Sequence, residues 1–95
     1  MSVPTMLPTM RYDPDREVVR IWPQEDDQHG PYLVTRHAIE DRIGSRERLS
    51  PDELIDACEV HEAYFASIAA RKLVRGEVDP DGRAVVMALD VTATV

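Results

Sequence analysis

Two short stretches near the N-terminus have the alternating, β-branched pattern of β-strands. Residues 17–22 (Glu-Val-Val-Arg-Ile-Trp) are rich in β-branched and aromatic side chains, and turn residues precede them. Residues 31–34 (Pro-Tyr-Leu-Val) have the same character and follow an acidic stretch over residues 24–30. The pattern therefore predicts a β-hairpin with a long connection.

Two helices are predicted next, each marked by its capping residues. Thr35 is the expected N-cap of a short helix over residues 36–43, which Gly44 ends in the left-handed conformation. Ser50-Pro51-Asp52-Glu53 is a capping box with proline at the first helical position, and it begins an apolar period that continues to residue 75. One helix over residues 51–75 would be roughly 37 Å long, so its last turns would project or pack on a second subunit. Its core-facing side consists of Leu54, Ala57, Cys58, His61, Phe65, Ile68 and Ala69.

Residues 84–91 alternate once more and predict a third strand. The predicted order is β-β-α-α-β, and strands that do not alternate with single helices favour the α+β class. We predict a small α+β domain with an antiparallel or mixed sheet, covered on one face by a short and a long helix. The length suits a single domain over residues 1–95, with residues 1–10 as a loose arm or an edge strand.

Charge and cysteine content narrow the classes of partner. The chain has 11 Lys and Arg against 18 Asp and Glu, a net charge of −7. This excess of negative charge opposes binding to nucleic acid or to an anionic membrane, so we expect neither. One cysteine cannot form an intramolecular disulfide, and no stretch approaches the ~20 apolar residues of a membrane span. We expect a cytoplasmic protein.

The residues best suited to metal binding or catalysis lie on the predicted long helix. Cys58 and His61 are three residues apart on one helix face, and such a pair can bind zinc if two further ligands exist. Only His37 and His29 are available as nitrogen donors, so the alternative is that Cys58 and His61 are core residues. Phe65 stands where a zinc protease helix needs its second histidine. Nucleophile-elbow and glycine-rich phosphate motifs are missing from the sequence, so we predict neither an enzyme nor a cofactor.

Contact surfaces are the remaining candidates. Trp22 and Tyr32 lie on neighbouring predicted strands and form either part of the core or an exposed aromatic patch. Leu73, near the end of the long helix, and Val91, on the last strand, mark two surfaces suited to pairing with a second copy. We therefore predict a non-enzymatic structural or regulatory module that contacts a protein partner or forms a homodimer. The alternative is a metal- or small-ligand-binding protein that uses Cys58, His61 and His37.

Several short segments, in this order and spacing, resemble a known family. They are Arg11-Tyr12-Asp13 ahead of residues 18–22, the extended residues 32–35, Ala38-Ile39-Glu40, and Phe65, Ile68 and Ala69. The chain resembles, over roughly residues 6–91, the bacterial domain of unknown function family 1488. This resemblance implies a compact α+β fold and a bacterial cytoplasmic origin, but no activity. Where the family leads us to expect an Asn-Arg pair on the long helix, this chain has His61-Glu62.

Overall fold

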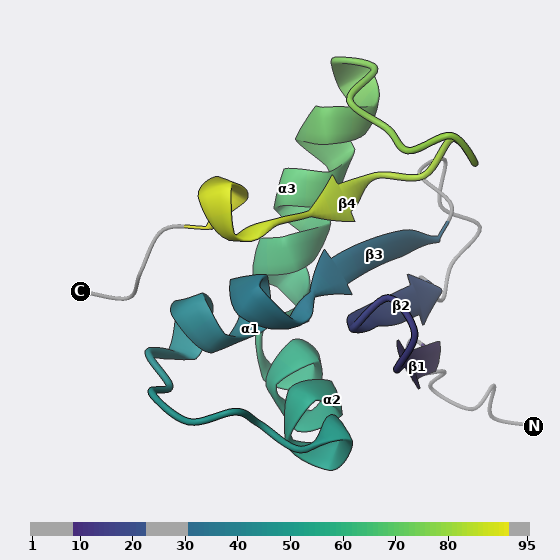
Figure 1. Cartoon of the computed structure of the whole chain (residues 1–95). Helices are drawn as coiled ribbons and strands as arrows, with labels where there is room; N and C mark the ends of the chain where they lie inside the picture. Colours follow the sequence, from purple (N-terminus) through teal and green to yellow (C-terminus); the bar gives the residue numbers. More distant parts are fainter. Residues whose placement is uncertain (1–8, 23–30, 92–95) are drawn as a thin grey trace, which may run out of the picture.

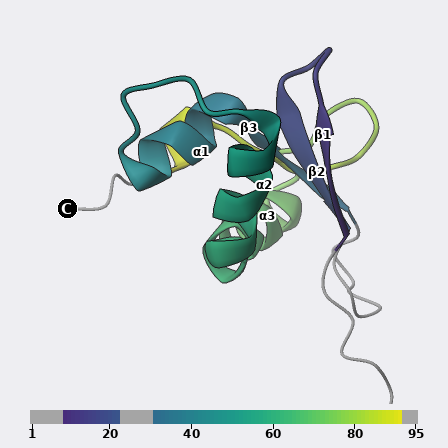
Figure 2. The ribbon, with the colours of Figure 1, turned by 90° about the horizontal axis from the view of Figure 1, so that it is seen from below.

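The computed structural model describes residues 9–22 and 31–91, which form a four-stranded mixed sheet with helices on one side (Figures 1 and 2). The strand order is β1-β2-β3-β4. Its strands are β1 (Thr9–Asp13), β2 (Val18–Trp22), β3 (Tyr32–Thr35) and β4 (Val85–Val86). The first three strands are antiparallel, whereas β4 runs parallel to β3. The predicted α+β class and the mixed sheet are confirmed.

The N-terminal segment contributes an edge strand, which is one of the two alternatives predicted for residues 1–10. Residues 9–13 form β1, in which Met10 is paired with Ile21 and Tyr12 with Val19, while residues 1–8 lie outside the described residues. The hairpin turn is held by Asp13, whose Oδ1 accepts the backbone N–H of Asp15 at 3.0 Å. Of the two readings for residues 1–10, the edge strand is therefore the correct one for residues 9 and 10.

The capping residues predicted from the sequence start and end the first helices as expected. Helix α1 (Arg36–Ile43) begins where the Thr35 hydroxyl accepts the Ala38 N–H, and it ends at Gly44, whose φ of 70° is left-handed. Helix α2 (Pro51–Val60) begins with the complete capping box between Ser50 and Glu53. Both ends of α1 and the start of α2 could therefore be predicted from neighbouring residues alone.

The predicted single long helix is wrong, because the chain breaks at His61 into α2 and α3 (Glu62–Val74). His61 has φ −105° and ψ 20°, although its N–H still donates to Ala57 and its carbonyl still accepts the N–H of Phe65. Helix α2 packs against β1 and β2, and α3 packs against β3 and β4. Since strands lie about 4.8 Å apart, a straight helix of this length would overshoot a four-stranded sheet. The break lets α2 and α3 both bury their apolar faces against the sheet. The last turns therefore do not have to project from the domain or pack on a second subunit.

The predicted eight-residue last strand is also wrong. Only β4 pairs with β3, and the chain then turns into the single 3₁₀ turn η1 (Ala88–Asp90). The Asp90 carboxylate accepts the Met87 N–H at 2.9 Å and the buried Lys72 ammonium at 2.5 Å. These bonds hold the chain in a turn, so Leu89 points to solvent rather than sharing a sheet face with Val85.

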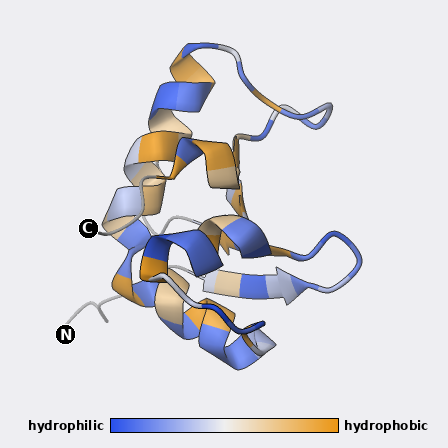
Figure 3. Ribbon diagram, turned by 60° about the vertical axis from the view of Figure 1, so that its left-hand side comes forward, coloured by the Kyte–Doolittle hydropathy of each residue, from blue (hydrophilic) through white to orange (hydrophobic). Residues whose placement is uncertain are grey.

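The hydrophobic core lies between the sheet and the helices. Along each helix, Figure 3 shows hydrophobic segments interrupted by hydrophilic ones, as expected when only one face is buried. The predicted stripe on residues 54–69 is buried as expected except at His61, which is half-buried at the helix break. The core cluster consists of Val19, Ile21, Tyr32, Val34, Ala38, Ile39, Leu54, Ala57, Cys58, Phe65, Ile68, Ala69, Ala84 and Val86.

Candidate functional site

The sequence-predicted metal ligands are not brought together. Cys58 is fully buried in the core, and burial raises the pKa of its thiol to about 12, so the enclosed thiol is protonated and is not a nucleophile at neutral pH. The rings of His61 and Phe65 form a T-shaped pair, with 6.3 Å between their centroids. His37 is exposed on α1 beside Glu40, and His29 lies outside the described residues. Among residues 9–22 and 31–91, no three His, Cys, Asp or Glu side chains are grouped to hold a metal ion.

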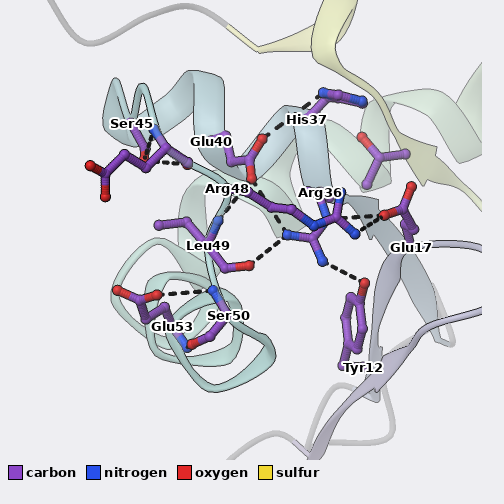
Figure 4. Close-up of polar contacts among 12 residues, drawn as sticks. Tyr12, Glu17, Arg36, His37, Glu40, Ser45, Arg48, Leu49, Ser50 and Glu53 are labelled. Carbon is purple, nitrogen blue, oxygen red and sulfur yellow. Dashed lines mark hydrogen bonds and ion pairs between the residues drawn. The ribbon is translucent and has the colours of Figure 1, made fainter.

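Arg36 is a buried cation with hydrogen bonds or ion pairs to four other residues (Figure 4). Its side chain is only 4% exposed, and Nη1 donates to the carbonyl of Leu49 while Nη2 donates to the Tyr12 hydroxyl, both at 2.6 Å. Its backbone N–H donates to the Glu17 carbonyl at 2.9 Å. One guanidinium therefore ties together β1, the β1–β2 turn, α1 and the loop before α2.

Two carboxylates balance the charge of Arg36. The Glu17 Oε1 lies 3.4 Å from its Nε, and the Glu40 Oε2 lies 3.5 Å from its Nη1. Glu17 also accepts a hydrogen bond from Arg48, and this bond, with the positive charges of Arg48 and Arg36, holds the pKa of the Glu17 carboxyl below its ordinary value. We call Tyr12, Glu17, Arg36, Glu40 and Arg48 the Arg36 cluster.

The composition of the Arg36 cluster indicates a structural role. It contains two cations and two anions, so it offers no net charge to a ligand. Glu17 adopts φ 54°, a left-handed conformation that is unfavourable for a residue with a side chain, and the surrounding bonds hold it there. One indirect signal was present in the sequence: Arg36 directly follows the helix cap Thr35, where a side chain lies close to the strand ends.

Of the residues predicted to form a contact surface, Tyr32 is buried in the core, whereas Trp22, Leu73 and Val91 are only partly buried. Tyr32 is 2% exposed and belongs to the core, so the core-packing reading applies to it and the exposed-patch reading is wrong. Leu73 and Val91 are partly buried and pack against the core. Trp22 is half-buried at the end of β2. Tyr32 is buried because the sheet register places it opposite Ile21 on the helix-covered face.

A different set of apolar side chains is exposed around the last strand. Val78 and Met87 are 40% and 46% exposed, and both line an open depression of about 460 Å³, as does Val85. Leu89, two residues beyond Met87, is 97% exposed. We call Val78, Val85, Met87 and Leu89 the β4 surface. The sequence analysis pointed to the last strand as a contact surface, but it predicted a continuous strand over residues 84–91, so it foresaw neither the turn at Leu89 nor the part taken by Val78.

The turn that carries Leu89 is held in place by an ion pair with a buried lysine. Lys72 on α3 is 7% exposed, and its ammonium reaches the Asp90 carboxylate. Burial alone would raise the pKa of Asp90, but the hydrogen bonds from Lys72 and from the Met87 N–H outweigh it and hold that pKa below its ordinary value. The charged pair therefore holds η1 against α3.

Comparison with known proteins identifies the family. The family model described as "Protein of unknown function (DUF1488)" matches residues 8–86, most of the 95-residue chain, and the chain belongs to this family. No curated protein and no solved structure matches the chain. In the described residues, no helix has the length and the apolar run needed to cross a bilayer.

Proposed function

We propose that the protein acts through contacts with a second copy of itself, made by the β4 surface, rather than by catalysing a reaction. The observation that carries the proposal is the position of Leu89. A leucine side chain that is 97% exposed stands on a turn held by a buried ion pair, so the fold keeps this apolar group in solvent. Burying such a side chain in an interface is worth about 1.5–3 kcal/mol.

The β4 surface supplies both halves of a two-fold contact. Leu89 is the protruding part, and the depression is the receiving part. Its apolar lining is Val78, Val85 and Met87, and its charged lining is Arg16, Lys72, Glu77 and Asp79. In a two-fold interface the same patch serves on both subunits, so Leu89 of each copy enters the depression of the other. Strand β4 lies at the edge of the sheet, which leaves one side of its backbone available to the partner.

The chemistry of the remaining described groups supports a contact role. Cys58 is enclosed in the core, and the Arg36 cluster satisfies its charges internally. A module that works by association needs no reactive group. We place it in the cytoplasm of a bacterium, as the sequence led us to expect.

The test is the mass of the full chain in solution, measured by light scattering after size-exclusion chromatography over a range of concentrations. We expect a dimer that Leu89→Asp converts to a monomer, because the substitution places a charge in the apolar contact. Val60→Asp is the matched control, since Val60 is also exposed, at 79%, but lies on α2. A chain that is monomeric at every concentration, or equal dissociation by Val60→Asp, would refute the proposal.

A further inference from the structure

The outer face of the sheet, opposite the helices, carries two arginines that face each other. Met10, Tyr12, Val19 and Ile21 contact the core, so the residues between them point to the other side. Arg11 of β1 and Arg20 of β2 are direct partners in the register. Side chains at such positions are about 5 Å apart at their Cβ atoms.

This pairing is unfavourable in the isolated protein. Like charges directly opposite each other destabilise an antiparallel pair. Arg20 is partly compensated by Asp13, with Nη2 3.0 Å from Oδ2, whereas Arg11 is exposed and has no ion pair with the described residues. The three side chains leave one net positive charge on a protein whose net charge is −7. An anion between the two guanidinium groups would remove the repulsion.

An aromatic ring lies beside the arginine pair. Trp22 follows Arg20 by two residues, so both side chains are on the same face of β2. Arg11, Asp13, Arg20 and Trp22 line one open depression of about 420 Å³. Guanidinium groups bind phosphate with paired hydrogen bonds, and an indole face stacks on planar rings.

From this arrangement we propose that the depression binds a mononucleotide, with its phosphate on Arg11 and Arg20 and its base against Trp22. Each part of the ligand matches one feature of the depression. The phosphate offsets the repulsion between the two arginines, and the base stacks on the indole. A nucleic-acid polymer fits less well, because a net charge of −7 repels a chain of phosphates more strongly than a single one. This site is on the opposite face of the sheet from the core and is independent of self-association through the β4 surface.

Trp22 is the only tryptophan in the chain, so its fluorescence reports on this depression alone. Titrating the full protein with AMP is expected to quench that fluorescence to saturation. Adenosine, which lacks the phosphate, should bind at least about tenfold more weakly, as expected for the loss of charge-assisted hydrogen bonds. Inorganic phosphate should compete with AMP without quenching. Absence of saturable quenching by AMP would overturn the proposal.

Arg11→Gln is the decisive variant, because Arg11 makes no ion pair with residues 9–22 or 31–91 whose loss would disturb the fold. We expect AMP binding at least about tenfold weaker, together with a higher midpoint of thermal unfolding as the repulsion disappears. Arg46→Gln is the control, since Arg46 is exposed in the loop between α1 and α2. Unchanged AMP affinity in Arg11→Gln, or an equal loss in Arg46→Gln, would overturn the assignment. Tighter binding of a short single-stranded oligonucleotide than of AMP would overturn it in favour of a polymer.

Discussion

Replacing Arg36 by methionine should destabilise this fold strongly, because Arg36 is a buried charged residue with several polar partners. The substitution keeps an unbranched apolar stem but removes the guanidinium that bonds to Leu49 and Tyr12. It also leaves the Glu40 carboxylate, 14% exposed, without its cation. Hydrogen bonds from a charged donor contribute about 1.5–3 kcal/mol each.

The expected loss follows from these contacts. Removing one partner of a buried ion pair costs about 3–5 kcal/mol, because the other charge stays buried without compensation. A domain of this size has a total unfolding free energy of about 5–15 kcal/mol. We therefore expect Arg36→Met to remove about 3–5 kcal/mol, a large share of the stability.

Urea denaturation followed by circular dichroism measures this loss directly, since the described residues include the helices α1, α2 and α3. Arg48→Met is the matched control: Arg48 pairs with the same Glu17, but its side chain is 68% exposed, so its loss should cost less than about 1 kcal/mol. A similar, small effect of both substitutions would refute the argument that burial makes the Arg36 cluster important. A double-mutant cycle with Tyr12→Phe would then show whether the hydroxyl bond contributes at all.

Two further predictions concern the core and the C-terminal turn. Because the pKa of Cys58 is raised to about 12 and the thiol is enclosed, it should not react with a thiol reagent at pH 8 until urea unfolds the chain; labelling of the folded protein, followed by mass spectrometry, would contradict this. The pKa of Asp90 is lowered in the folded state, so its contribution is present above its ordinary value of 3.8 and is lost as the pH falls through the folded value. The gap in unfolding free energy between the wild type and Asp90→Asn should accordingly narrow below about pH 4, and a gap independent of pH would refute the role of the carboxylate.

The local signals in the sequence were sufficient wherever a few neighbouring residues decide the structure. Thr35 and Gly44 bound α1, and Ser50 with Glu53 starts α2, because capping depends on side chains within one helical turn. The strand at residues 18–22 is defined by its own β-branched residues. The α+β class followed from the order of such elements.

The candidate sites depended on contacts between residues distant in the sequence, and there the pattern was insufficient. Lys72 and Asp90 are separated by 18 residues, and their ion pair turns a predicted strand into η1 and exposes Leu89. Arg36 and Tyr12 are separated by 24 residues, so no local motif marks the Arg36 cluster. The pairing of Arg11 with Arg20 became visible only once β1 had a register.

By itself, then, the sequence determined the starts of α1 and α2, the class of the fold and most of the buried stripe on residues 54–69, because these follow from propensity, capping and periodicity. Only the tertiary structure decided where the long apolar period breaks. At His61 no proline or glycine interrupts the sequence, yet the helix divides so that α2 covers β1 and β2 while α3 covers β3 and β4. The reason is the width of a four-stranded sheet, which a single straight helix of that length exceeds.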